Sequence, residues 1–149
     1  MDIKIKKIYE DGKIPTRGSE YAAGFDLYAY IPESEGGMIK IPPHETRMVE
    51  TGVAVQPPKG TFGAIFARSG LASKEGLRPA NAVGVCDFDY TGEYKVALHN
   101  DSNFVAYVEN GERIAQLVFI PYITGDFIEV DELDSTERGS GGFGSTGKN

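Results

Sequence analysis

Cysteine, tryptophan and long apolar runs are scarce or absent in this sequence. Among its 149 residues there is one cysteine, Cys86, and no tryptophan. A single cysteine excludes an intramolecular disulfide and a cysteine-based zinc site. No apolar run approaches the roughly 18 residues of a membrane-spanning helix, and segment 1–6 alternates in polarity instead of forming the apolar core of a signal peptide. We therefore expect a soluble, cytoplasmic protein with no membrane partner.

Positive charge is also in short supply. The chain carries 15 basic and 22 acidic residues, which give a formal net charge of −7 at pH 7. A polyanion approaching this protein would meet an unfavourable overall field, so we expect no nucleic-acid partner. Any anionic ligand would need local donors or a metal ion.

Turn-forming residues are plentiful instead. There are 19 glycines and 8 prolines, and between them apolar and polar residues alternate with a period of two, which is typical of strands. Only 69–74 could be helical, and the Asn110-Gly111 pair is typical of a hairpin turn. The pattern predicts one all-β domain of sandwich, jelly-roll or barrel type, with strands within 3–8 and 49–55 and over Thr61–Ala67, Tyr94–Leu98, Phe104–Val108, Ile114–Ile120 and Phe127–Val130.

The last residues differ from the rest of the chain. Five of the eleven residues from Gly139 to Asn149 are glycine, and they include one aromatic residue, Phe143. Such a stretch cannot contribute much to a core. We expect a β domain over residues 1–134 and a flexible arm over residues 135–149.

Two segments place a polar residue within an apolar strand pattern. Asp26 interrupts the stretch 23–29, and Gln116 lies within 114–120. Asp26 could occupy an exposed strand position or a capped turn, and Gln116 could face solvent. A buried glutamine would instead need a hydrogen-bonding partner.

In a third segment, Arg68-Ser69-Gly70, a strand gives way to the short helix. Backbone N–H groups, a hydroxyl and a guanidinium at such a junction could bind an anion. An ordinary serine cap beside a surface arginine is the alternative.

A fourth segment, 81–93, is a glycine-bounded turn that contains Asp87, Asp89 and Tyr90. A carboxylate here could act as a general base if a water lies within reach. The alternative is a polar hairpin tip with side-chain-to-backbone turns.

The fifth segment is the tail, 137–147. Its glycine-rich backbone could wrap phosphates, Arg138 adds charge, and Phe143 offers a face on which a base could stack. A disordered tail is the alternative.

Taken in chain order, these five segments resemble the five motifs of the homotrimeric dUTP diphosphatases, the dUTPase family. The resemblance covers about residues 3–147. It implies a jelly-roll-like dUTPase (β-clip) fold with one short helix and a flexible C-terminal arm. It also implies hydrolysis of dUTP to dUMP and diphosphate, which keeps uracil out of DNA and supplies dUMP for thymidylate synthesis. Mg²⁺ would be the cofactor, bound to the triphosphate and waters, and the partners would be dUTP and two further copies of the chain, with sites at subunit junctions.

The resemblance also implies roles for individual residues. Asp87 matches the catalytic base, and Asp26 would orient the attacking water or a metal-bound water without ligating the metal directly. Arg68, Ser69 and Gly70 would hold phosphate oxygens with help from Gln116, and Arg113 would support them. Asn81 and the backbone from Gly84 to Tyr90 would bind uracil, while Tyr90 would pack on the deoxyribose and exclude a 2′-hydroxyl. The tail would supply Phe143 for stacking on uracil and a phosphate-closing set of Arg138, Gly144, Ser145 and Thr146.

One residue departs from the family pattern, and two other functions compete. Cys86 stands where the family usually has a branched apolar residue, and we expect it to pack as a small hydrophobe. A dCTP deaminase of the same fold family would typically carry Arg-Ser-Ser where this chain has Arg68-Ser69-Gly70, and would lack the Asp-x-Asp-Tyr turn. A non-catalytic nucleotide-sensing or protein-binding homologue would not need Asp26, Asp87, Tyr90 and the full tail together.

Overall fold

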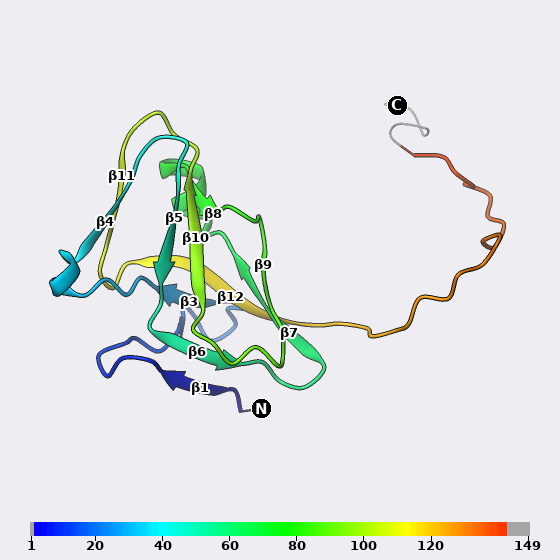
Figure 1. The fold of residues 1–149 in the computed structure, drawn as a ribbon, viewed down its shortest axis with the longest axis horizontal. Coiled ribbons are helices and arrows are strands. Elements are labelled where there is room, and N and C mark those ends of the chain that lie inside the picture. Colours follow the sequence, from blue (N-terminus) through cyan, green and yellow to red (C-terminus); the bar gives the residue numbers. More distant parts are fainter. Residues whose placement is uncertain (1, 143–149) are drawn as a thin grey trace.

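The computed structural model describes residues 2–142, and nearly all of its regular structure is β-strand (Figure 1). The strands form antiparallel pairs in four small sheets. In chain order the elements are β1 (Lys4–Lys7), β2 (Thr16–Arg17), β3 (Phe25–Tyr28), η1 (Glu33–Glu35), β4 (Met38–Ile41), β5 (Thr46–Glu50), β6 (Val53–Gln56), β7 (Thr61–Phe66), η2 (Leu71–Glu75), β8 (Leu77–Pro79), β9 (Gly84–Cys86), β10 (Lys95–Asn100), β11 (Ala106–Glu109) and β12 (Arg113–Pro121).

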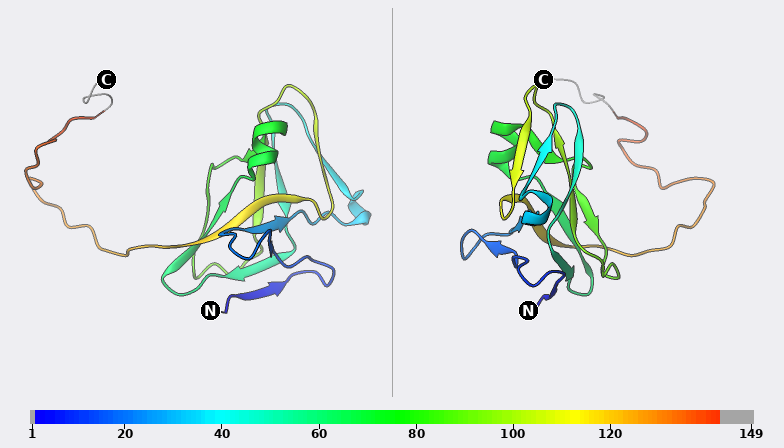
Figure 2. Two further views of the ribbon diagram at one scale, coloured as in Figure 1. Left: turned by 180° about the vertical axis from the view of Figure 1, so that it is seen from behind. Right: turned by 60° about the vertical axis from the view of Figure 1, so that its left-hand side comes forward.

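The largest sheet has the strand order β2-β3-β12-β7-β9; it carries Asp26, Gly84 and Gln116, while Arg68 and Asp87 follow its strands β7 and β9. The other sheets are β5-β10-β8, β11-β4 and β1-β6. Figures 1 and 2 show that the sheets pack together into one body. One cluster of buried apolar side chains fills the space between the sheets, with members from β3, β5, β7, β10 and β12. The expected all-β architecture with one short helix is confirmed.

The short helix forms close to its expected place. We expected it over 69–74, and η2 covers Leu71–Glu75. Gly76 ends it with φ +71°, a left-handed conformation that glycine adopts without a steric penalty. Within residues 2–142, no helix is long and apolar enough to cross a membrane.

The expected hairpin at Asn110-Gly111 is wrong. The turn forms, and Gly111 has φ +79°, but β11 pairs with β4 while β12 pairs with β3 and β7. The turn is bound to segment 29–37 instead: the Asn110 N–H donates to the Gly37 carbonyl, and the Gly111 N–H donates to the Ala29 carbonyl. A turn motif fixes the direction of the chain, but it does not fix which strands pair.

The strand expected over Phe127–Val130 is also wrong for this single chain. The last strand ends at Pro121, and segment 122–142 leaves the body as an extended, exposed chain (Figure 1). The Phe127 side chain is fully exposed, at 107% of its reference area. Alternating apolar residues give a segment a strand-like surface, but a strand forms only against a neighbouring backbone.

Candidate active site

Three strands bring together the polar residues of three separate segments. In the β3-β12-β7 part of the large sheet, Asp26 on β3 lies opposite Gln116 on β12, and Gln116 lies opposite Phe66 at the end of β7. Arg68 follows β7 by two residues. This row of residues, Asp26, Gln116 and Arg68, therefore brings together an acid, an amide and a guanidinium from positions up to 90 apart in the sequence.

Asp26 is the centre of this row. Its Oδ1 accepts a hydrogen bond from Arg68 Nε at 3.0 Å, and its Oδ2 accepts one from Arg113 Nη1 at 3.3 Å. The Asp26 side chain is only 15% exposed, compared with 29% for Arg68 and 51% for Arg113. Arg68 Nη1 also donates to the Arg113 carbonyl at 3.1 Å. Two arginines are thus fixed by one carboxylate, with donors left over for an anion.

Gln116 does not simply face solvent. It is half-buried, and its Nε2 donates to the Ala67 carbonyl at 2.9 Å. A side chain at Gly24 would come within 2.8 Å of Gln116 Oε1, so the glycine leaves the space that the amide occupies. This hydrogen bond fixes the chain immediately before Arg68.

Ser69 and Gly70 lie exposed where β7 gives way to the helix. The Ser69 carbonyl accepts a hydrogen bond from the Ser73 hydroxyl at 2.6 Å, and the Ala72 N–H donates to the Arg68 carbonyl. A Cβ at Gly70 would meet nothing within 4 Å. The fold itself therefore does not require a glycine there, and its absent side chain leaves the backbone open to a ligand.

The acidic turn, within segment 81–93, follows β9, which is an edge strand of the same sheet. β9 pairs with β7, with Cys86 opposite Gly63, and Asp87 follows directly. Because β10 pairs with β5 and β8, the segment between β9 and β10 is a loop and not the hairpin tip considered as the alternative for this segment. Asp87 and Asp89 line a groove of about 600 Å³, together with Phe62, Val85, Phe88 and Tyr122.

Tyr90 folds back over its own loop instead of lining that groove. Its hydroxyl donates to the Glu93 carbonyl at 2.9 Å, and its ring stacks on Tyr94. Asn81 is exposed beside Ala82, whose φ of +60° marks a sharp turn. Gly84 is buried where a Cβ would come within 3.1 Å of the Ile65 side chain, so β9 can approach β7 closely.

The single chain does not bring the acidic turn to the arginines. Asp87 lies beside Phe62 at one end of β7, whereas Arg68 follows the other end. Arg68 follows Phe62 by six positions, and at about 3.3 Å per residue the two backbones are roughly 20 Å apart. One phosphate chain cannot contact both groups within this chain.

Arg138, on the tail, also lies apart from the rest of the site. Arg138 is exposed on the extended segment, where its Nε donates to the Gly141 carbonyl at 2.9 Å. The remaining predicted tail residues, Phe143, Gly144, Ser145 and Thr146, lie outside the described residues.

Sequence reasoning missed two aromatic residues and undervalued one arginine. Phe62 and Tyr122 line the groove beside Asp87, and their rings pack edge to face. Phe62 lies within an expected strand and Tyr122 follows one, so no local pattern indicated that either lines a site. Arg113 contacts Asp26 directly, and only the register of β3 against β12 reveals that contact.

No ready-made metal cage is present in the part of the chain that the structure describes. Within residues 2–142 there is no group of three or more His, Cys, Asp or Glu side chains that could hold a metal ion. Behind the acidic turn, burial raises the pKa of the Cys86 thiol to about 11. Cys86 therefore remains a neutral thiol at pH 7 and packs as an apolar residue.

Comparison with known proteins agrees with this geometry. A family model described as dUTPase matches residues 10–147. The chain is 46% identical over 140 residues to the deoxyuridine 5′-triphosphate nucleotidohydrolase of Candida albicans, which covers 93% of this chain and 83% of that protein. It is 45% identical over 150 residues to the protein of that name from Desulfitobacterium hafniense strain DCB-2. This match covers 99% of this chain and 97% of that protein. The relative from Escherichia phage T5 is 46% identical over 147 residues, a match that covers 97% of this chain and 98% of that protein.

A solved structure shares the fold. A mutant dUTPase of Staphylococcus bacteriophage 80alpha, solved with dUpNHpp, superposes with a TM-score of 0.86 at 28% identity and covers 98% of both chains. The family match extends over nearly the whole sequence, and the curated relatives exceed 40% identity over almost all of it. The chain belongs to the dUTPase family.

Proposed function

We propose that this protein hydrolyses dUTP to dUMP and diphosphate by attack of water on the α-phosphorus. The observation that carries the proposal is the convergence of Arg68 and Arg113 on Asp26, beside the open backbone of Gly70. Phosphoryl transfer depends on positioning and charge stabilisation more than on a covalent nucleophile. The relatives named above are nucleotidohydrolases, which disfavours a dCTP deaminase. The activity would keep uracil out of DNA and supply dUMP for thymidylate synthesis, and we place it in the cytoplasm.

The arginine side of the site would bind the phosphates. Arg68 keeps Nη donors free of Asp26, and Ser69 and Gly70 present exposed backbone next to it. Gln116 would act chiefly through the Ala67 carbonyl, which it holds in place before Arg68. Local guanidinium charge offsets the triphosphate even though the whole chain is acidic.

The acidic turn would supply the base. Asp87 is exposed in a groove large enough to admit a nucleotide, and its carboxylate would take the proton of the attacking water. Asp26, which pairs with both Arg68 and Arg113, would orient that water from the arginine side of the site. Mg²⁺ would bind the triphosphate oxygens and stabilise the charge that develops on them.

Substrate selection would lie in the same loop. The backbone from Gly84 to Tyr90, together with Asn81, would read uracil, and this readout rejects cytosine through mismatched donors and a 5-methyl group through lack of space. Tyr90 would pack on the deoxyribose and leave no room for a 2′-hydroxyl.

The glycine-rich arm, residues 135–149, would close over the bound nucleotide as a lid. Phe143 would stack on uracil, and the phosphates would meet Arg138, Gly144, Ser145 and Thr146. The site would then combine the β domain, residues 1–134, with a mobile segment that excludes water during reaction.

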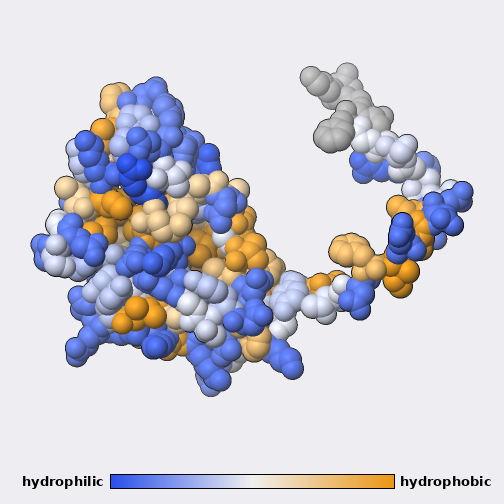
Figure 3. All heavy atoms as spheres, viewed as in Figure 1, coloured by the Kyte–Doolittle hydropathy of each residue, from blue (hydrophilic) through white to orange (hydrophobic). Residues whose placement is uncertain are grey.

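We further propose a homotrimer whose three sites lie at subunit junctions. The distance of roughly 20 Å along β7 between Asp87 and Arg68 supports this arrangement, because a second copy must supply one of the two groups. The extended segment also carries large apolar side chains that a single chain leaves in water, among them Ile123, Phe127 and Ile128. Figure 3 shows hydrophobic residues along this segment. Exposed apolar surface of this kind marks an interface.

The test is diphosphate release from dUTP with Mg²⁺, with dCTP, UTP and dTTP run alongside. We expect strong preference for dUTP, and no ammonia from dCTP. Comparable turnover of UTP would contradict the role of Tyr90, and ammonia release from dCTP would favour the deaminase. A monomeric mass by light scattering, with activity intact, would contradict the trimer.

A further inference from the structure

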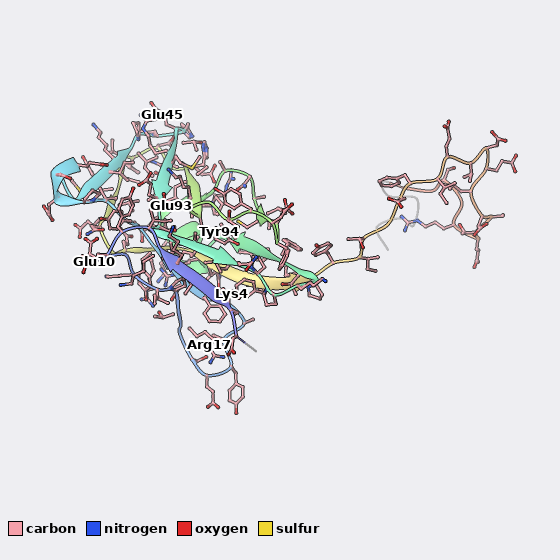
Figure 4. All side chains as sticks on the ribbon, turned by 60° about the horizontal axis from the view of Figure 1, so that its bottom comes forward. Lys4, Glu10, Arg17, Glu45, Glu93 and Tyr94 are labelled. Atoms are coloured by element: carbon pink, nitrogen blue, oxygen red, sulfur yellow. The ribbon has the colours of Figure 1, made fainter. Side chains whose placement is uncertain are left out.

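Tyr94 is a large polar side chain buried almost completely behind the acidic turn. Its exposed fraction is 1%, and Figure 4 shows it next to Glu93 among the strands. Within residues 2–142, its hydroxyl is the buried side-chain polar atom that makes no hydrogen bond. An unpaired buried hydroxyl is destabilising. The ring, and not the hydroxyl, is therefore the useful part of this residue.

Small residues make room for that hydroxyl. A Cβ at Gly63 would lie 3.1 Å from the Tyr94 oxygen, so a larger residue there would crowd it. Cys86, the residue that departs from the family pattern, is the other neighbour; burial raises the pKa of the Tyr94 hydroxyl, and the nearby Cys86 raises it further. Gly63 and Cys86 lie opposite each other on β7 and β9, so the two small residues face the ring from adjacent strands.

The backbone of Tyr94 is fixed from two directions. Its N–H donates to the Val53 carbonyl at 2.8 Å, and its carbonyl accepts a hydrogen bond from the Thr51 hydroxyl at 2.5 Å. The preceding residue is held in the same way, since Glu93 Oε1 accepts a hydrogen bond from the Gly52 N–H at 2.8 Å. Residues 93 and 94 are thus tied to the corner between β5 and β6.

Tyr90 rests on this fixed segment. Its ring stacks on the Tyr94 ring at a centroid distance of 6.2 Å and an interplanar angle of 25°. Its hydroxyl donates to the Glu93 carbonyl at 2.9 Å. A Cβ at Gly92 would lie 2.6 Å from the Tyr90 hydroxyl, so the glycine permits the ring to fold back. The contacts that orient Tyr90 therefore come from residues 92–94.

We propose that Tyr94 is a positioning residue for sugar selection: its buried ring holds Tyr90 at the place where a 2′-hydroxyl would collide. This inference rests on the proposed function, because it assigns Tyr90 the deoxyribose. A rigid support turns the Tyr90 ring into a steric wall, whereas a mobile ring would yield to the extra hydroxyl of UTP.

The experiment compares three substitutions in the full chain: Tyr94→Leu, Tyr94→Met and Tyr94→Phe. Leucine removes the flat face, methionine removes it but fills the volume with a flexible side chain, and phenylalanine keeps the face and deletes only the unpaired hydroxyl. The readout is kcat/KM for dUTP divided by kcat/KM for UTP. Thermal unfolding monitors the fold.

We expect the dUTP preference to fall about 2- to 10-fold in the leucine and methionine variants, the range that one aromatic pair supplies. The phenylalanine variant should keep the wild-type ratio and melt no earlier than wild type. A methionine variant that is folded and loses activity equally toward dUTP and UTP would overturn the inference and leave the proposed function standing. A wild-type chain that does not hydrolyse dUTP would overturn both.

Discussion

Replacing Asp26 with asparagine removes the negative charge that Arg68 and Arg113 share. In the folded chain the Asp26 carboxylate accepts hydrogen bonds from Arg68 at 3.0 Å and from Arg113 at 3.3 Å. The amide has nearly the same shape and can still accept one hydrogen bond. It cannot balance two guanidinium charges that lie within reach of each other.

The expected loss in the free energy of unfolding follows from how far the three side chains are exposed to solvent. Asp26 and Arg68 are mostly shielded, and Arg113 is half exposed. Hydrogen bonds to charged groups contribute about 1.5–3 kcal/mol and neutral ones about 0.5–1.5 kcal/mol, so the Arg68 bond should weaken by about 1 kcal/mol. The exposed Arg113 pair adds at most about 1 kcal/mol. We therefore expect the free energy of unfolding to fall by about 1–2 kcal/mol.

Turnover should fall further than stability suggests. Arg68 would be held less firmly, by the amide and the Arg113 carbonyl, and misplacement of a catalytic group by about 1 Å can cost on the order of 10²-fold in rate. We expect Asp26→Asn to lower kcat for dUTP by about 10- to 100-fold. Steady-state diphosphate release measures this, with thermal unfolding beside it.

Asp101→Asn is the matched control. Asp101 also binds an arginine through both oxygens, Arg78 at 2.5 and 3.0 Å, but Arg78 lies on β8 of the β5-β10-β8 sheet and neither residue is assigned a role in the site. It should leave kcat unchanged. An Asp26→Asn protein with a lowered melting temperature and wild-type turnover would refute the reasoning, because the ion pairs would then hold the fold alone.

Four further changes test other parts of the account. Asp87→Asn should reduce turnover by about 10²- to 10⁴-fold while dUTP binding stays within an order of magnitude; near-wild-type turnover would implicate Asp89 as the base. Deleting residues 137–149 should leave the melting curve and the oligomer intact but reduce turnover by roughly two orders of magnitude or more, and Phe143→Ala should show part of that defect; unchanged turnover would exclude a lid. Burial raises the Cys86 pKa from 9.0 to about 11, so the folded state retains the thiol proton more tightly than the unfolded state. That contribution to stability is complete below pH 9 and is lost as the pH rises to 11. The stability difference between wild type and Cys86→Ala in urea should shrink over that window, and a constant difference would contradict the burial argument.

Periodicity predicted the strands, but not how they pair. The strands within Thr61–Ala67 and Ile114–Ile120 were expected, because buried strands alternate and are bounded by glycine and proline. The false hairpin at Asn110-Gly111 shows the limit of local signals, since the neighbouring strands join different sheets. Pairing depends on contacts between segments far apart in the chain, and turn chemistry carries no information about them.

The site shows the same division. Asp26, Arg68 and Gln116 could be singled out because each has a side chain that its surroundings do not explain. The binding of Arg113 to Asp26 could not, because it depends on the β3-β12 register and the irregularity between Arg113 and Ala115. Phe127 and its neighbours looked like a strand because their alternation is real, but a single chain offers them no backbone to pair with.

The central claim is that dUTP is hydrolysed at a site built from more than one copy of the chain. Mixing two inactive variants tests it directly: Asp87→Asn keeps Arg68, and Arg68→Ala keeps Asp87. If neighbouring subunits supply the two groups, a random one-to-one mixture refolded together restores about one quarter of the sites, because each needs an intact Asp87 copy beside an intact Arg68 copy. The account predicts diphosphate release from dUTP at about that fraction of the wild-type rate. No recovery from a mixture shown to contain mixed oligomers would contradict it.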